Sequence, residues 1–251
     1  MRYAMVVEYD GTAYSGWQRQ KNAMSVQQKI EDAMAIVFGK KVVIVASGRT
    51  DSGVHALGQV AHFDWDKELN TRSTMYSINS LLPDDIKLQK LFRVSDDFHA
   101  QYSAKRKTYI YKSYVSESAS PLKDRFYARI LPPVDVEKMK KASLALVGKH
   151  DFKAFCSTGS SINSTEREIY SLDIIESGDE IIFEITGNGF LYNMVRIIVG
   201  TLYFIGKGKL PENAIEEMLL TGSRKKGGKT YPACGLTLKS VEYIDEPQLK
   251  I

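Results

Sequence analysis

The stretch VVIVASGRTDSGVHA (residues 42–56) joins an apolar run of β-branched residues to a short loop that contains a single acid. β-Branched residues favour a strand over 42–47. The loop carries Gly48 and Gly53 on either side of Asp51, and glycine adopts backbone conformations that other residues resist. The segment therefore predicts a buried strand that ends in a loop able to hold one carboxylate in a fixed direction.

The residues around this loop predict the order βαββαβ for the first half of the chain. Ser25 and Gln28 have the spacing of a capping box, and the apolar residues that follow recur at helical period. A second periodic stretch is stopped by Pro83. The expected elements are strands over 1–10, 42–47, 58–65 and 86–93, with helices after Ser25 and before Pro83.

The second half predicts further α/β alternation. Residues 192–206 are apolar almost all round, which is typical of a buried helix. The other expected elements are strands over 106–115, 170–176, 180–187 and 235–243, and helices over 135–148 and 211–221. Helices mixed with antiparallel strands favour an α+β fold, which we divide into domains 1–104 and 105–251.

Composition excludes several classes of protein. The chain has 251 residues, of which 43% are hydrophobic and 25% charged, as expected of a globular protein. No apolar run is long enough to span a membrane, and the acidic N-terminal segment MRYAMVVEYD does not resemble a signal peptide, so we expect a cytoplasmic protein. Two cysteines without CxxC spacing and four scattered histidines predict no metal site.

Basic residues are concentrated in two segments. The net charge is +4, and the clusters lie at 105–107 and 222–231. One such cluster alone is more typical of a solvated loop, but two of them in a chain with 14 tyrosines favour a surface that binds a polyanion. The sequence contains no Walker-type phosphate loop, and no pair of hydrolytic carboxylates is apparent.

Two interpretations of Asp51 follow from the residues alone. An Asp between glycines often caps its own turn, and the spacing by itself favours this role. Alternatively, Arg49 and the neutral donors Thr50 and Ser52 would stabilise the charge of the carboxylate, as a nucleophile or base requires.

The GRTDSGVHA segment resembles the GRTDxGVHA signature of the tRNA pseudouridine synthase A family. Four further segments resemble that family in the same order: EYDGTAYSGWQRQ (8–20), FHAQYSAKRKTYIY (98–111), GFLYNMVRIIVG (189–200) and CGLTL (234–238). Together, the five matches span the chain.

The resemblance implies a role for each site residue. Asp51 corresponds to the essential aspartate, Tyr109 to the tyrosine that stacks on the target uracil, and Arg196 to the arginine that pairs with the aspartate. Arg49 either fills the space of a displaced base, holds a phosphate or makes an ordinary surface pair. The alternative for Tyr109 is that it is a core aromatic residue, like its neighbour Tyr111 on the same strand. The alternative for Arg196 is that its cation only reaches out of an apolar helix to solvent.

Six other residues are minor candidates. We expect His55 to be structural. RNA could stack on Tyr14, Trp17 and Arg19, although Trp17 is at least as compatible with the core. Two further tyrosines, Tyr102 and Tyr192, flank the proposed site.

The resemblance also implies the activity and the fold. The family isomerises uridine to pseudouridine at positions 38, 39 and 40 in the anticodon stem-loop of tRNAs, without cofactor, as a homodimer with tRNA spanning both subunits. Its fold has two RRM-like or ferredoxin-like α+β domains with antiparallel sheets that flank a basic RNA-binding cleft. Alternatives are a pseudouridine synthase with another RNA target, such as rRNA, and a non-catalytic RNA-binding module.

Overall fold

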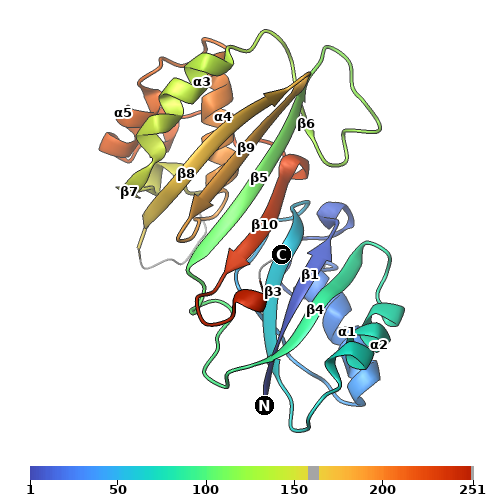
Figure 1. The fold of residues 1–251 in the computed structure, drawn as a ribbon. Coiled ribbons are helices and arrows are strands. Elements are labelled where there is room, and N and C mark those ends of the chain that lie inside the picture. Colours follow the sequence, from blue (N-terminus) through green and yellow to red (C-terminus); the bar gives the residue numbers. More distant parts are fainter. Residues whose placement is uncertain (158–163, 250–251) are drawn as a thin grey trace. The chain divides into compact units, whose positions relative to one another are not determined.

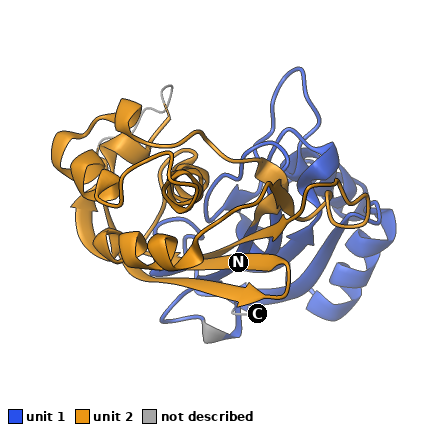
Figure 2. Cartoon of the chain, turned by 90° about the horizontal axis from the view of Figure 1, so that it is seen from above, with its two compact units in different colours: residues 1–107, 237–251 blue, residues 108–236 orange. Residues whose placement is uncertain are grey.

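The computed structural model describes residues 1–157 and 164–249 (Figure 1). The chain forms two compact units: unit 1 contains residues 1–107 and 237–251, and unit 2 contains residues 108–236 (Figure 2). The division into domains 1–104 and 105–251 counts the last strand with the second domain, whereas this strand packs within unit 1. The domain boundary itself stays a prediction.

Unit 1 has the predicted βαββαβ order. Its elements are β1 (Arg2–Tyr9), α1 (Val26–Phe38), β2 (Val45–Ala46), β3 (His55–Asp64), α2 (Thr71–Leu81), β4 (Ile86–Val94) and β10 (Leu236–Glu242). Strand β1 lies between β4 and β3 and is antiparallel to both. On its other side β3 pairs with β2 antiparallel and, near its start, with β10 in parallel. The order β4-β1-β3-β2 is that of a ferredoxin-like sheet.

Caps set the ends of the helices in unit 1. The Ser25 hydroxyl accepts a hydrogen bond from the backbone N–H of Gln28 at 3.2 Å, which confirms the predicted start of α1. Gly39, with φ 69°, ends that helix. Helix α2 ends just before Pro83, as predicted. The two helices lie side by side in Figure 1 and contact each other.

The predicted strand over 42–47 is wrong in length, because only β2 (Val45–Ala46) pairs with β3. Side chains of α1 take the place of a strand partner before it. The Gln27 amide donates to the Ile44 carbonyl at 3.2 Å, and the Ile44 N–H donates to the Glu31 carboxylate at 3.2 Å. The β-branched pattern indicated extended backbone correctly, but it could not show which groups would satisfy that backbone.

Unit 2 is also mixed α+β. Its elements are β5 (Arg106–Val115), β6 (Ala128–Ile130), α3 (Val136–Ser143), β7 (Gly148–Asp151), β8 (Glu166–Ser177), β9 (Glu180–Gly187), α4 (Met194–Gly206) and α5 (Ala214–Thr221). The sheet has the order β5-β9-β8-β7, and β6 pairs in parallel with β5. Helix α3 packs against α4.

Two helices predicted in unit 2 can be compared with the structure. The helix expected over 135–148 ends at Ser143 and continues as a 3₁₀ turn, because β7 begins at Gly148, where φ is 107°. The helix expected over 192–206 is confirmed as buried: all residues of α4 except Arg196 and Phe204 are buried. Among the described residues, no helix is long and apolar enough to cross a membrane.

Buried His62 on β3 makes the stability of unit 1 depend on pH. Its Nδ1 accepts a hydrogen bond from the Ala100 N–H at 3.1 Å. Burial, together with the positive charge of Arg2, lowers the pKa of His62 to about 4. Because this pKa lies below the value in an unfolded chain, the unfolded state binds the extra proton first. Stability is therefore complete above about pH 6.5 and falls as the pH drops toward 4.

We expect His62→Asn, which offers an acceptor oxygen in place of Nδ1, to be less stable than wild type at pH 7 but less sensitive to acid. About 3 kcal/mol of the loss between pH 6.5 and 4 should disappear. Urea unfolding of wild type and variant at pH 7, 6, 5 and 4 measures the free energy of unfolding at each pH. Parallel stability curves for wild type and variant would show that His62 is not the responsible group.

Candidate active site

The loop that carries Asp51 lies between β2 and β3, and its turn is closed by backbone groups. The Val54 N–H donates to the Asp51 carbonyl at 3.1 Å, and Gly53 adopts φ 77°. The turn is therefore closed through the backbone carbonyl of Asp51, and its side chain is half-buried.

The N-terminal motif EYDGTAYSGWQRQ (8–20) packs against the loop that carries Asp51. The Trp17 N–H donates to the Thr50 carbonyl at 3.1 Å, and the Gly53 N–H donates to the Tyr14 carbonyl at 3.3 Å. A β-carbon on Gly11 would lie 2.0 Å from the Val54 carbonyl oxygen. Backbone packing this close explains why glycine is needed in EYDGTAYSGWQRQ, and it makes the two motifs one structural unit.

His55 and Trp17 serve this packing. The Gly11 N–H donates to His55 Nδ1 at 3.0 Å, and an oxygen of the Asp10 carboxylate lies 3.1 Å from the same nitrogen. Trp17 is 1% exposed and lies 5.9 Å from the Tyr9 ring. Both side chains therefore have structural positions in unit 1.

A buried polar network supports the residues around Asp51. The Ser47 hydroxyl donates to the Gln59 amide oxygen at 2.7 Å, and the Gln59 amide donates to the Gly48 carbonyl at 3.0 Å. The hydroxyls of Tyr9 and Thr50 share a hydrogen bond of 2.7 Å, and burial raises the pKa of Tyr9. Satisfied networks of this kind fix a loop in one conformation.

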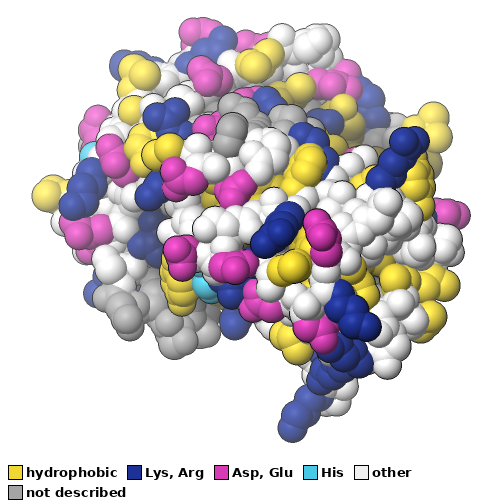
Figure 3. All heavy atoms as spheres, turned by 60° about the horizontal axis from the view of Figure 1, so that its bottom comes forward, with side chains coloured by type: hydrophobic (Ala, Val, Ile, Leu, Met, Phe, Trp, Pro, Cys, Tyr) yellow, Lys and Arg dark blue, Asp and Glu magenta, His cyan; other side chains and the backbone are white. Residues whose placement is uncertain are grey.

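Lys107 belongs to this support and not to a solvated basic surface. Its ammonium donates to the Ser47 carbonyl at 2.7 Å, and its side chain is half-buried. Lys105 and Arg106 are exposed, as predicted for the cluster. On the face drawn in Figure 3, Lys and Arg side chains are interspersed with Asp and Glu.

Lys107→Met is expected to lower the free energy of unfolding by about 1–3 kcal/mol, because it leaves the Ser47 carbonyl without this charged donor. Lys105→Met makes the same change at an exposed side chain and should cost less than about 0.5 kcal/mol. Urea denaturation of both variants measures the difference. Equal stability of the two would place Lys107 outside the support of the loop.

Arg49 is exposed on the same loop. Its guanidinium has no hydrogen-bond or ion-pair partner within residues 1–157 and 164–249. An exposed guanidinium is suited to a phosphate, which accepts its paired donors.

Tyr109 and Tyr111 differ in burial although both lie on β5 in unit 2. Tyr111 is completely buried and donates its hydroxyl to the Pro232 carbonyl at 2.9 Å, so it is a core residue. Tyr109 is half-buried, and its ring makes a T-shaped contact with the Phe190 ring, with centroids 5.2 Å apart and planes at 83°. Phe190 thus limits the rotation of the Tyr109 ring. The sequence did not indicate this contact.

Arg196 is oriented at the start of α4 by two neutral groups. Its Nε donates to the Tyr231 carbonyl and its Nη1 donates to the Asn193 side-chain oxygen, both at 2.7 Å. Asn193 has φ 62°, a left-handed conformation that Asn tolerates better than most residues. The guanidinium is therefore fixed within unit 2. Its expected pairing with Asp51 stays a prediction.

The basic segment 222–231 is partly structural. A β-carbon on Gly200 of α4 would lie 1.9 Å from the Lys229 carbonyl oxygen, so this segment packs directly on the helix. Lys226 pairs with Glu217 at 2.9 Å, and burial lowers the pKa of Arg224. The cluster therefore contributes fewer solvated charges than its sequence suggests.

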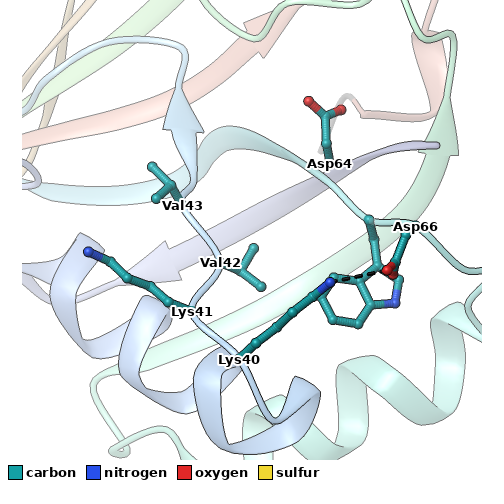
Figure 4. A pocket seen from close by; sticks show the side chains of 7 residues that line it. Lys40, Lys41, Val42, Val43, Asp64 and Asp66 are labelled. Carbon is teal, nitrogen blue, oxygen red and sulfur yellow. Dashed lines mark hydrogen bonds and ion pairs between the residues drawn. The ribbon is translucent and has the colours of Figure 1, made fainter.

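One pocket lies in unit 1 away from these groups. It has a volume of about 510 Å³ and is lined by Lys40, Lys41, Val42, Val43, Asp64, Trp65 and Asp66 (Figure 4). Lys40 lies over the Trp65 ring at 4.2 Å and pairs with Asp66 at 3.1 Å. No residue of the loop 48–56 lines it. In the described part of the chain, no group of three or more His, Cys, Asp or Glu side chains is placed to hold a metal ion.

Comparisons with known proteins agree with the motifs. The family model described as tRNA pseudouridine synthase matches residues 5–103 and 142–244. The chain belongs to this family. The tRNA pseudouridine synthase A of Ruminiclostridium cellulolyticum is 46% identical over 95% of this chain and 98% of that protein. A protein of the same name from Thermoanaerobacter sp. is 47% identical over 97% of this chain and 100% of that protein. Another, from Bacillus licheniformis, is 43% identical over 97% of this chain and 99% of that protein.

As a member of the tRNA pseudouridine synthase family, the chain is an RNA isomerase with the α+β fold described above. Asp51 lies in the first segment matched by the family model and Arg196 in the second, whereas Tyr109 lies between the two.

Proposed function

We propose that this protein converts uridine to pseudouridine at positions 38, 39 and 40 in the anticodon stem-loop of tRNAs. The observation that carries the proposal is the GRTDSGVHA loop, whose backbone is held by a second family motif through the Trp17 and Tyr14 hydrogen bonds. A loop built this way presents one half-buried carboxylate, Asp51, from a fixed position. Relatives named tRNA pseudouridine synthase A are 43–47% identical.

The reaction needs no net redox change. The bond between N1 of the uracil and C1′ of the ribose breaks, the base rotates, and C5 forms the new bond to C1′. The hydrogen on C5 leaves as a proton, and N1 gains one. Asp51 supplies the carboxylate that acts on the target nucleotide, and the proposed reaction uses no cofactor.

The target base must leave its stack to reach Asp51. Flipping costs a few kcal/mol, which stacking on an aromatic side chain offsets. Tyr109 supplies that ring, and the edge contact from Phe190 holds it in place. Arg196, oriented by Tyr231 and Asn193, pairs with Asp51 and keeps its carboxylate charged.

The remaining contacts are to the RNA backbone. Arg49, Lys105 and Arg106 are exposed and are assigned to phosphates. We further propose that the protein acts in the cytoplasm as a homodimer with tRNA spanning both subunits in a basic cleft. The support for this part is the family to which the chain belongs.

Mapping of pseudouridine in a strain that lacks the gene tests the substrate. Loss at positions 38, 39 and 40 of tRNAs, restored by the wild-type gene, is the expected result. Loss confined to rRNA would contradict the tRNA assignment. Unchanged pseudouridine in both RNAs, with tRNA binding by the purified protein, would indicate a non-catalytic RNA-binding module.

A further inference from the structure

The segment 99–103, here called the His99 turn, presents an aromatic ring to solvent. Tyr102 is 77% exposed, and one face of its ring stacks on the His99 imidazole with centroids 4.3 Å apart and planes 28° apart. Its hydroxyl has no hydrogen-bond partner among residues 1–157 and 164–249. At this exposure, the face of the ring that His99 does not cover is open to solvent.

The His99 turn is held rigidly by its own hydrogen bonds. The backbone N–H groups of Gln101 and Tyr102 both donate to His99 Nδ1, at 3.2 and 3.3 Å. The Ser103 N–H donates to the His99 carbonyl at 2.9 Å, and the Ser103 hydroxyl accepts from the His99 N–H at 3.0 Å. Four hydrogen bonds in five residues leave this backbone little freedom.

The same turn is anchored to the core of unit 1. The Ala100 N–H donates to buried His62, and the Ala100 carbonyl accepts from the Tyr243 hydroxyl at 2.6 Å. The His99 ring meets the His62 ring at 4.8 Å in an edge contact. The backbone that carries Tyr102 is therefore fixed by contacts with the core. A ligand that stacks on Tyr102 does not lose binding free energy to ordering of the loop.

We propose that Tyr102 is a stacking platform for an unpaired base of the RNA substrate, separate from the base that reacts at Asp51. A planar base matches the uncovered face of the ring, and unpaired bases of RNA are typically bound by such stacking. Lys105 and Arg106, exposed three and four residues further on, supply charge for the adjoining phosphates. This inference rests on the proposed function, because it takes an RNA as the substrate.

The test compares the affinity of Tyr102 variants for an unmodified tRNA transcript. Tyr102→Ala is expected to raise Kd about tenfold, and Tyr102→Phe, which keeps the ring, to bind like wild type. Turnover at saturating tRNA should be the same in all three proteins, because the proposed platform binds a base other than the one that reacts. Affinity of Tyr102→Ala within twofold of wild type, or equal weakening by Tyr102→Phe, would overturn the proposal.

Two further measurements identify the ligand. A fully paired RNA duplex should bind wild type and Tyr102→Ala equally, and a tenfold loss there would show that the ligand is not an unpaired base. The slope of log K against log salt should be unchanged in Tyr102→Ala. In Lys105→Ala it should be smaller by about 0.7–0.9 for each phosphate that the protein no longer neutralises. A reduced slope in Tyr102→Ala would point to altered charge interactions and would also contradict stacking.

Failure of this inference can be told from failure of the proposed function. If wild type converts the transcript and Tyr102→Ala binds it normally, the platform is wrong and the activity stands. If wild type does not convert the transcript, the proposed function fails. The thermal stability of Tyr102→Ala should match wild type, because the four hydrogen bonds of the His99 turn use no Tyr102 side-chain atom.

Discussion

Asp51→Ala is expected to lower the rate of pseudouridine formation by about 10³-fold or more while binding of tRNA largely survives. The variant removes the carboxylate that we propose to act on the nucleotide, whereas the turn is closed by the Asp51 backbone carbonyl and is kept. Single-turnover rates with saturating enzyme measure the chemical step, and filter binding measures Kd.

Asp84→Ala is the matched control for this variant. It removes the same charge from a side chain of unit 1 that is fully exposed and only loosely paired with Lys87, at 3.7 Å. Its rate and affinity should equal those of wild type. Turnover by Asp51→Ala within tenfold of wild type would remove Asp51 from the mechanism, and a large loss of tRNA affinity would assign it to binding.

Gly16→Ala is expected to impair both folding and activity. Gly16 has φ 85°, and a β-carbon there would lie 2.4 Å from the Thr50 carbonyl oxygen, one residue before Asp51. The contact is with backbone, so the loop must move. We expect a loss on the order of 3 kcal/mol in unfolding free energy. The turnover of the folded fraction should fall about 10²-fold, because a displacement near 1 Å is enough for such a loss.

Gly39→Ala separates the strain of a positive φ from the steric contact. Gly39 ends α1 with φ 69°, and a β-carbon there would meet nothing within 4 Å. It should cost about 1 kcal/mol and leave turnover unchanged. Urea denaturation and single-turnover assays on both variants make the comparison. Normal turnover by folded Gly16→Ala would show that this segment does not position the Asp51 loop.

The fold of unit 1 was predictable where the signal was local. Ser25 and Pro83 marked helix ends, and alternating or helical periods marked the elements between them. The pairing of β10 with β3 joins residues far apart in the chain, which no local pattern records. Strand β2 was overestimated because side chains of α1, and not a strand, satisfy the backbone at Ile44.

The candidate site was predictable only through its motifs. Spacing alone favoured a turn cap at Asp51, and the ordered family segments supplied Tyr109 and Arg196. The supporting residues gave no such signal. A run of basic residues does not reveal that one of them, Lys107, donates to the Ser47 carbonyl and is not part of a solvated cluster. Phe190 lies inside a recognised motif, but its contact with Tyr109 joins residues that are far apart in the sequence.

The most direct test of the central claim is release of a label from C5 of uracil. An unmodified tRNA transcript carrying tritium at C5 of its uridines is incubated with the wild-type protein, and tritium in the solvent is counted. The expected result is release that reaches at most three equivalents per tRNA and is confined to transcripts with uridine at position 38, 39 or 40. No release above that of Asp51→Ala, with tRNA bound, would contradict the assignment of this chain as a tRNA pseudouridine synthase acting through Asp51.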